Sequence, residues 1–157
     1  MSTEAANVQT LKEAYRRWHD SKGASVDYWF DSVVAHHISF GSVPRGAAPL
    51  KFAAQYNNDL ELRGYFDGLL SEWNMEHYAM DEYIAQGDVV VARGSCAWTH
   101  KKTGKLAETP KIDYWRFKDG KAVEFYEYYD TASVLAAASP CCGYSLQARP
   151  VSAGAHS

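Results

Sequence analysis

The sequence has few cysteines and no run of basic residues. Its three cysteines, Cys96, Cys141 and Cys142, are an odd number without C-x-x-C spacing, so neither a disulfide framework nor a metal centre is expected. Its 16 Lys and Arg residues are outnumbered by 19 Asp and Glu residues, which gives a formal net charge of -3 at pH 7. A nucleic-acid partner is therefore not expected.

Long apolar runs are also missing. The N-terminal stretch MSTEAANVQTLKEAYRR has neither the apolar core of a signal peptide nor the length of a membrane-spanning helix. We therefore expect a cytoplasmic protein with no membrane partner.

Aromatic residues, in contrast, are abundant. They make up 14% of the 157 residues and include eleven Tyr and five Trp. A core of this size does not need so many for packing alone, and such residues suit the wall of an amphipathic cavity or an oligomer interface. The hydrophobic fraction of 46% is ordinary for one globular domain.

The spacing of apolar residues predicts three helices and one strand in the first half of the chain. Residues 3–23 repeat apolar side chains along one helical face, and residues 25–32 are typical of a short second helix. Residues 33–40 are typical of a strand, and residues 58–73 of a third helix. The Gly- and Pro-containing stretch 41–57 between them predicts a long loop.

After residue 73 the apolar period changes to two. This period predicts a four-strand meander over residues 74–86, 88–100, 106–117 and 122–130. The pair Asp119-Gly120 is a strong hairpin signal between the last two strands. We therefore expect one domain over residues 1–138, followed by a dispensable low-complexity tail over residues 139–157.

The order of these elements, with GSVPRG at residues 41–46 and IDYWRFKDGKAVEFYEYYD at residues 112–130, resembles the nuclear transport factor 2 superfamily. That superfamily includes ketosteroid isomerases and SnoaL-like polyketide cyclases. The resemblance implies an α+β fold, in which a cone-shaped, curved antiparallel sheet wraps around three N-terminal helices and encloses a pocket. It also implies a homodimer formed through the outer face of the sheet, which we expect to carry Tyr78, Met80 and Ile84.

Residues 112–117 (IDYWRF) are similar to the strand motif Ile-Asp-His-Phe-Arg-Phe of ketosteroid isomerase. The resemblance implies that Asp113 is a protonated acid that donates a hydrogen bond to an oxyanion. It places Tyr15 close to the partner tyrosine of that enzyme. The position of the isomerase's general base falls on Ile38, which cannot accept a proton.

The alternation of the strands indicates further residues on the same face as Asp113, among them Glu127 on the neighbouring strand. Glu127 resembles an acid of limonene epoxide hydrolases. Those enzymes need an Arg-x-Asp, whereas this chain has Arg93-Gly94-Ser95, with Arg93 expected on the outer face.

Two histidines are further candidates, because an imidazole titrates near neutral pH. His36 shares a strand face with Ile38, and His77 shares one with Trp73 and Met75. His77 also resembles a catalytic histidine of scytalone dehydratase, another member of the superfamily.

The sequence thus predicts a cofactor-free acid/base enzyme that acts on a small hydrophobic, oxygenated molecule such as a polyketide, steroid-like or terpenoid compound. The candidate catalytic residues are Asp113, Tyr15, His36, His77 and Glu127. The candidate ligand-binding residues are Trp18, Ile38, Phe40, Trp98, Trp115, Phe117, Phe125 and Tyr129. A non-catalytic ligand-binding or dimeric accessory protein and an epoxide hydrolase-like enzyme remain alternatives.

Overall fold

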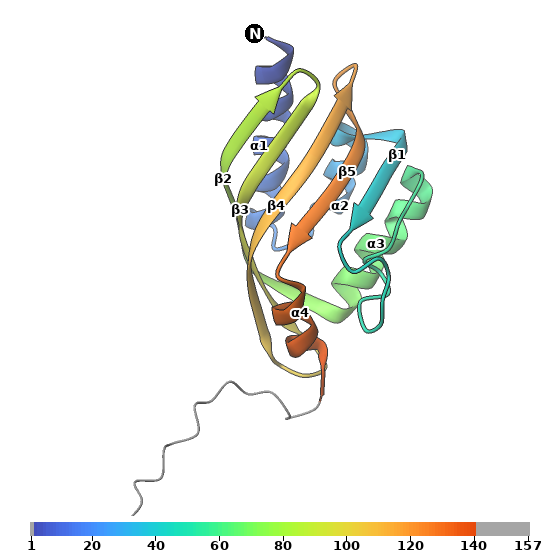
Figure 1. Cartoon of the computed structure of the whole chain (residues 1–157), viewed down its shortest axis with the longest axis vertical. Helices are drawn as coiled ribbons and strands as arrows, with labels where there is room; N and C mark the ends of the chain where they lie inside the picture. The colour runs from blue at the N-terminus through green and yellow to red at the C-terminus, as the bar shows by residue number, and fades with distance from the viewer. Residues whose placement is uncertain (1, 141–157) are drawn as a thin grey trace, which may run out of the picture.

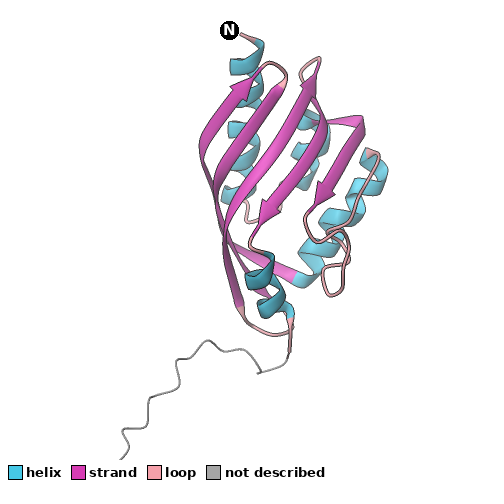
Figure 2. Ribbon diagram, in the orientation of Figure 1, coloured by secondary structure: helices cyan, strands magenta, loops and turns pink. Residues whose placement is uncertain are grey.

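The computed structural model describes residues 2–140, in which helices pack on a five-stranded sheet (Figures 1 and 2). The α-helices are α1 (Thr3–Asp20), α2 (Val26–Tyr28), α3 (Asp59–Glu72) and α4 (Thr131–Ala138), and a π-helical turn (Trp29–Val33) follows α2. The strands are β1 (Val34–Ser42), β2 (Trp73–Gln86), β3 (Val89–His100), β4 (Leu106–Lys118) and β5 (Lys121–Tyr129). The expected tail lies outside the described residues from residue 141 on.

The sheet has the strand order β1-β5-β4-β3-β2. Strands β2 to β5 form the expected antiparallel meander, but β1 runs parallel to β5. The expectation of a wholly antiparallel sheet is wrong at this edge, because no tight hairpin joins β1 to β5 and forces them antiparallel. Figure 1 shows α1, α2 and α3 on one face of the sheet, so the α+β cone with N-terminal helices is confirmed.

Helix α1 begins at the predicted residue and ends at Asp20, three residues before the predicted Gly23. The Ser2 side chain accepts a hydrogen bond from the backbone N–H of Ala5, which caps the first turn. At the other end Gly23 adopts a positive φ of 87° and its N–H donates to the carbonyl of Trp18. The buried face of the helix includes Tyr15, which is thereby directed toward the sheet.

The turn between β4 and β5 fixes the register of the two strands that carry the candidate acids. Asp119 and Gly120 both have positive φ, as the hairpin signal predicts. In the resulting register Asp113 is directly opposite Glu127. The two carboxylates therefore project from the same face of the sheet as cross-strand neighbours.

A β-bulge in β2 changes which side chains face inward. The register with β3 shifts between Met75 and His77, so that an extra residue interrupts the alternation. As a result Tyr78 is buried and His77 is exposed. The predictions that His77 faces the pocket and that Tyr78 lies on the outer face are both wrong for this reason.

The C-terminal end of the sheet leads directly into α4. The side chain of Asp130 accepts a hydrogen bond from the backbone N–H of Ser133 and so caps this helix. No helix within residues 2–140 is both long and apolar enough to cross a bilayer.

Candidate functional site

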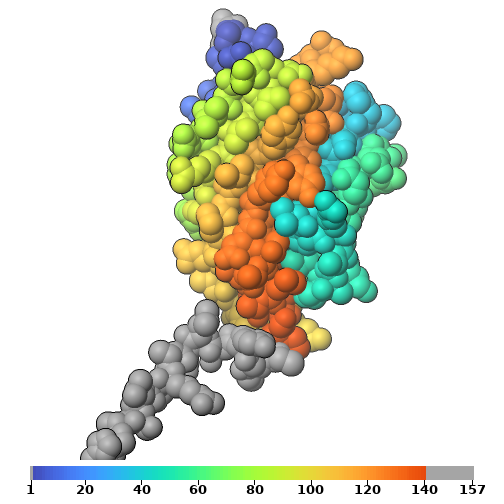
Figure 3. Space-filling model, in the orientation of Figure 1, coloured from blue at the N-terminus to red at the C-terminus, as the bar shows by residue number. Residues whose placement is uncertain are grey.

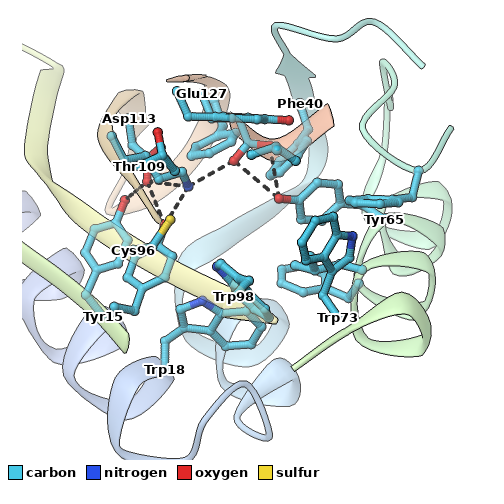
Figure 4. Close-up of a pocket in the computed structure, with 18 of the residues that line it drawn as sticks. Tyr15, Trp18, Phe40, Tyr65, Trp73, Cys96, Trp98, Thr109, Asp113 and Glu127 are labelled. Atoms are coloured by element: carbon cyan, nitrogen blue, oxygen red, sulfur yellow. Dashed lines mark hydrogen bonds and ion pairs between the residues drawn. The ribbon is translucent and has the colours of Figure 1, made fainter. Parts of the chain in front are cut away.

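A cavity of about 90 Å³ lies between the sheet and helices α1 and α3. Its apolar wall is mostly aromatic and includes Trp18, Phe40, Phe66, Trp73, Trp98, Trp115 and Phe125. Its polar residues include Tyr15, Tyr65, Tyr78, Lys111, Asp113, Glu127 and Tyr129 (Figure 4). An apolar pocket with a few convergent polar groups is the usual form of a small-molecule site.

Asp113 is at the centre of the polar group and is only 1% exposed. The Tyr15 hydroxyl donates a hydrogen bond of 2.5 Å to its Oδ2, and the Tyr78 hydroxyl donates a longer one of 3.3 Å. Trp115 in turn donates from Nε1 to the Tyr15 oxygen at 2.8 Å. The structure therefore brings Asp113 and Tyr15 together in the pocket, although their chemical role stays a prediction.

Lys111 bridges the two buried acids. Its Nζ lies 3.0 Å from Oδ1 of Asp113 and 2.9 Å from Oε2 of Glu127, and it donates to the Tyr78 oxygen at 2.5 Å. The lysine side chain is only 8% exposed. Sequence reasoning missed this residue, although Lys111 is two positions before Asp113 on the same strand and period two places it on the same face.

Glu127 is held by neutral donors as well as by the lysine. Ser42, at the end of β1, donates from Oγ to Oε1 at 2.8 Å, and Tyr65 of α3 donates to the same oxygen at 3.0 Å. The Tyr129 hydroxyl lies 3.3 Å from Ser42 Oγ. Glu127, like Asp113, therefore lies in the pocket as the alternation of the strands predicts.

Burial controls the protonation of this cluster. It raises the pKa of Asp113 above its usual value; the Lys111 ammonium opposes this shift, and the Glu127 carboxylate adds to it. Burial alone would lower the pKa of Lys111, but the two acids outweigh it and raise that pKa well above the usual range. Burial also raises the pKa of Tyr15 and Tyr78 well above that of a free phenol. Near neutral pH, Lys111 is therefore a cation and the tyrosines are neutral.

The charges of the cluster add up to an excess of one negative charge. With Lys111 at +1 and both Asp113 and Glu127 at -1, the sum is -1. An unbalanced charge is costly in an apolar cavity. One added proton makes the cluster neutral, and burial, which raises the pKa of Asp113, favours the neutral form of that acid.

Some of the candidate residues lie outside the pocket. Ile38 and Phe117 are buried in the core and are not among the residues that line the cavity. His36 is 77% exposed and pairs with Asp59, since Nδ1 lies 2.7 Å from Oδ1. His77 packs against His19 at a ring distance of 5.4 Å, outside the cavity lining.

The other candidate ligand-binding residues do line the cavity. They are Trp18, Phe40, Trp98, Trp115, Phe125 and Tyr129. Cys96 lines it too, and burial raises the pKa of its thiol to about 11. This thiol is therefore protonated at neutral pH and is a poor nucleophile. Within residues 2–140 no three His, Cys, Asp or Glu side chains are grouped in a way that could hold a metal ion.

The family model of the SnoaL-like domain matches residues 11–125, so the chain belongs to the SnoaL-like family. A search of curated proteins found no match.

Solved structures share the fold. A nuclear transport factor 2-like protein from Burkholderia thailandensis is 28% identical, with a TM-score of 0.70 over 89% of this chain and 100% of the other. A candidate isomerase from Bacillus subtilis is 15% identical, with a TM-score of 0.72 over 90% and 98%. A candidate SnoaL-like polyketide cyclase from Mesorhizobium loti is 16% identical, with a TM-score of 0.66 over 82% and 100%.

Proposed function

We propose that this protein is a cofactor-free acid/base enzyme of the isomerase, cyclase or dehydratase type. The observation that carries the proposal is the buried cluster in which one ammonium, Lys111, lies between the carboxyl groups of Asp113 and Glu127. Neutrality of this cluster requires one proton on an acid, which gives the pocket a neutral acid and a carboxylate side by side. Pairs of carboxyl groups with different protonation are a recurrent arrangement in acid/base catalysis.

The two acids have complementary roles in the proposed reaction. Glu127 accepts a proton from a carbon next to a substrate carbonyl group, and the electron pair stays on the substrate as an enolate. Protonated Asp113 donates a hydrogen bond to the enolate oxygen, and the Tyr15 hydroxyl orients Asp113. Glu127 then returns the proton to another atom of the substrate. No redox or group-transfer partner is required.

The proposed substrate is a small hydrophobic molecule that carries oxygen. Aromatic walls favour flat apolar surfaces, and the polar end of the cavity favours a carbonyl or hydroxyl group. The SnoaL-like family and the names of two similar structures, an isomerase and a polyketide cyclase, are consistent with this class of chemistry.

The test has two stages. A thermal-shift screen of small oxygenated compounds identifies ligands, and mass spectrometry after incubation in D₂O detects exchange of their carbon-bound hydrogen. We expect Glu127→Gln to abolish exchange, Asp113→Leu to reduce it strongly, and Asp113→Asn, which keeps a donor, to retain much of it. Exchange that persists in both Glu127→Gln and Asp113→Leu would show that these acids are not the catalysts.

A non-catalytic binding protein is the second candidate function. The specific observation in its favour is that Lys111 and Glu127 already have partners within the cluster. In that case, ligands from the screen bind with the same affinity to wild type and Glu127→Gln, and no hydrogen exchange occurs in either. The epoxide hydrolase alternative has no support from the pocket, because Arg93 is 69% exposed and pairs with Glu82 outside it.

We also propose that the protein forms a homodimer through the outer face of the sheet. Figure 3 views this face, which α1 and α3 do not cover. Large apolar side chains are exposed on the strands, with Ile84 at 57%, Ile112 at 42% and Tyr128 at 52%. Exposed apolar surface of this kind favours association.

A further inference from the structure

Tyr78 joins the buried polar cluster from β2, the strand at the edge of the sheet. Its hydroxyl accepts a hydrogen bond from Lys111 Nζ at 2.5 Å and donates one to Oδ2 of Asp113 at 3.3 Å. Burial raises the pKa of this phenol well above its usual value, so the hydroxyl keeps its proton and makes both bonds at once. The position of Tyr78 therefore affects both the cation and the acid of the cluster.

The residue pattern of β2 does not by itself direct Tyr78 inward. Strict alternation from Met75 places His77 on the cavity side and Tyr78 on the outer side. In the structure the pairing with β3 is interrupted before His77 and again after Met80, and the two residues exchange faces. Because a slip of one residue would exchange them again, the bulged register needs contacts that select it.

The contact toward β3 depends on a glycine. Gly94 of β3 is opposite Met80, and a Cβ added at Gly94 would clash with the backbone carbonyl of Ala79. Only a residue without a side chain lets the two strands approach this closely. The close approach therefore fixes residues 78–80 on the side of β2 that faces β3.

The contact on the opposite side of β2 comes from His19, in the last turn of α1. Its Nδ1 accepts a hydrogen bond from the backbone N–H of Tyr78 at 3.1 Å. The outer side of an edge strand has no neighbouring strand to accept from its N–H groups, so the imidazole supplies the acceptor that a further strand would provide. Because a backbone N–H can only donate, Nδ1 is an unprotonated ring nitrogen.

Helix α1 holds Tyr78 by its ring as well as by its backbone. His19 lies one turn after Tyr15, so both side chains project from the same side of the helix. The Tyr15 ring stacks on the Tyr78 ring at a centroid distance of 5.7 Å and an interplanar angle of 17°. Both tyrosines line the cavity, whereas His19 is not among the residues that line it. His19 therefore acts on the cluster through Tyr78.

We propose that His19 is a positioning residue of the candidate site. By accepting the hydrogen bond of the Tyr78 N–H, it selects the bulged register of β2 in which the Tyr78 hydroxyl, and not the His77 ring, enters the buried cluster. The inference rests on the proposed function only in treating this cluster as the reactive centre. Its structural part, the choice of the side chain that enters the pocket, is tested without a substrate.

The test compares two changes at His19 with one at His77. His19→Phe keeps a ring and removes the acceptor, whereas His19→Asn keeps an acceptor, since its Oδ1 takes the place of Nδ1. His77→Phe is the matched control, because the His77 ring packs against His19 at 5.4 Å and its side chain makes no hydrogen bond within residues 2–140.

Nitration of the full chain by tetranitromethane, located by tandem mass spectrometry, reports which tyrosines are accessible. Tyr128, which is 52% exposed, is the internal standard, and the buried Tyr65 of α3 reports on the rest of the fold. We expect Tyr78 to be protected in wild type, His19→Asn and His77→Phe. In His19→Phe we expect its nitration relative to Tyr128 to rise about fivefold, the effect of one lost hydrogen bond, while Tyr65 stays protected.

Three results would overturn the inference. Protection of Tyr78 in His19→Phe would show that the bond does not select the register. Nitration of Tyr65 together with Tyr78 in that variant would show that His19 supports the whole fold and not this segment. Equal nitration of Tyr78 in His19→Asn and His19→Phe would show that the acceptor is not the cause.

Hydrogen exchange in D₂O extends the test to the proposed reaction. We expect His19→Phe to slow exchange into a ligand and His19→Asn to restore it. Exchange that is equally fast in wild type and His19→Phe would overturn the positioning role. A wild-type protein without exchange would count against the proposed function, and the nitration of Tyr78 would then decide the role of His19 by itself.

Discussion

Strand β4 carries two clusters of similar composition in opposite environments. Lys111 faces inward and lies between Asp113 and Glu127, with a side chain that is only 8% exposed. Arg116 has a 40% exposed side chain, and it pairs with Asp88 at 2.8 Å and with Glu124 at 3.1 Å. Each cluster combines one cation with two carboxylates, so the difference between them comes from burial and not from charge.

This comparison shows what a buried charge requires. Around Arg116, water and salt screen each charge, and the loss of one partner leaves the others solvated. Around Lys111, no water replaces a missing partner, so each group depends on the other two. The buried cluster around Lys111 can therefore shift the pKa of Asp113 upward. The exposed cluster around Arg116 only raises the pKa of an arginine that is already cationic.

The largest expected effect on stability comes from removal of the buried cation, Lys111. Lys111→Met leaves the two buried acids without a counter-ion, and we expect it to lower the free energy of unfolding by about 3–5 kcal/mol at pH 7. Arg116→Met is the matched control and should produce only a small fraction of this change. Urea unfolding followed by tryptophan fluorescence measures both, and equal effects of the two substitutions would contradict the comparison.

The next effect concerns a hydroxyl group in each cluster. Tyr15→Phe removes the hydrogen bond to Asp113 and the acceptor of the Trp115 N–H, and we expect a loss of about 1–3 kcal/mol in unfolding free energy. Tyr114→Phe removes the hydroxyl that accepts from Arg116 on the outer side, and it should change stability much less. Urea unfolding curves of the two variants at equal concentration test this order, and a larger loss in Tyr114→Phe would refute it.

A smaller effect should appear in the pH dependence of stability. Because the pKa of Asp113 is raised on folding, the folded state holds more protons than the unfolded state between the usual pKa near 3.8 and the raised value. The contribution of Asp113 is then favourable at low pH and is lost as pH rises through the folded pKa.

Asp113→Asn removes this dependence. Relative to wild type, the variant should gain stability as pH increases from 4 to 8, by about 0.5–2 kcal/mol at the upper end. Melting temperatures of both proteins across this range are the measurement. If the difference in stability between Asp113→Asn and wild type is constant with pH, or shifts in favour of wild type as pH rises, the pKa of Asp113 is not raised.

The smallest effect on the fold is expected on the outer face, where the proposed dimer forms. Ile112→Lys places a charge on an exposed position of β4, so the folded chain should change in stability by no more than about 0.5 kcal/mol. Sedimentation should nevertheless change from the mass of two chains to that of one. Leu60→Lys, at a 72% exposed position on α3, is the control that should remain dimeric. A wild-type protein that sediments as one chain at micromolar concentration would rule out the interface.

The fold could be predicted from sequence because its signals are local. Apolar periodicity marks α1 and α3, and Asp119-Gly120 marks the hairpin that aligns Asp113 with Glu127. The contact between Tyr15 and Asp113 spans 98 residues, so no local pattern contains it and only the resemblance to a family indicated it.

The differences between the sequence predictions and the structure have two physical causes. The alternation of β4 could have placed Lys111 on the same face as Asp113, but a lysine in a cavity is unexpected until its two acids are known to be adjacent. The orientations of His77 and Tyr78 could not be predicted from the sequence, because the β-bulge before His77 leaves the residue pattern of β2 unchanged. Only the pairing with β3 reveals which of the two faces inward.

The hairpin and the helices contribute different groups to the pocket, and this difference affects how the pocket assembles. Lys111, Asp113 and Glu127 all belong to the β4–β5 hairpin, whereas α1 and α3 contribute the neutral hydroxyls of Tyr15 and Tyr65. Contacts within a hairpin require little loop-closure entropy and can form early. The three charges can therefore pair while they are still hydrated, and the helices that later exclude water bring no charge of their own into the pocket.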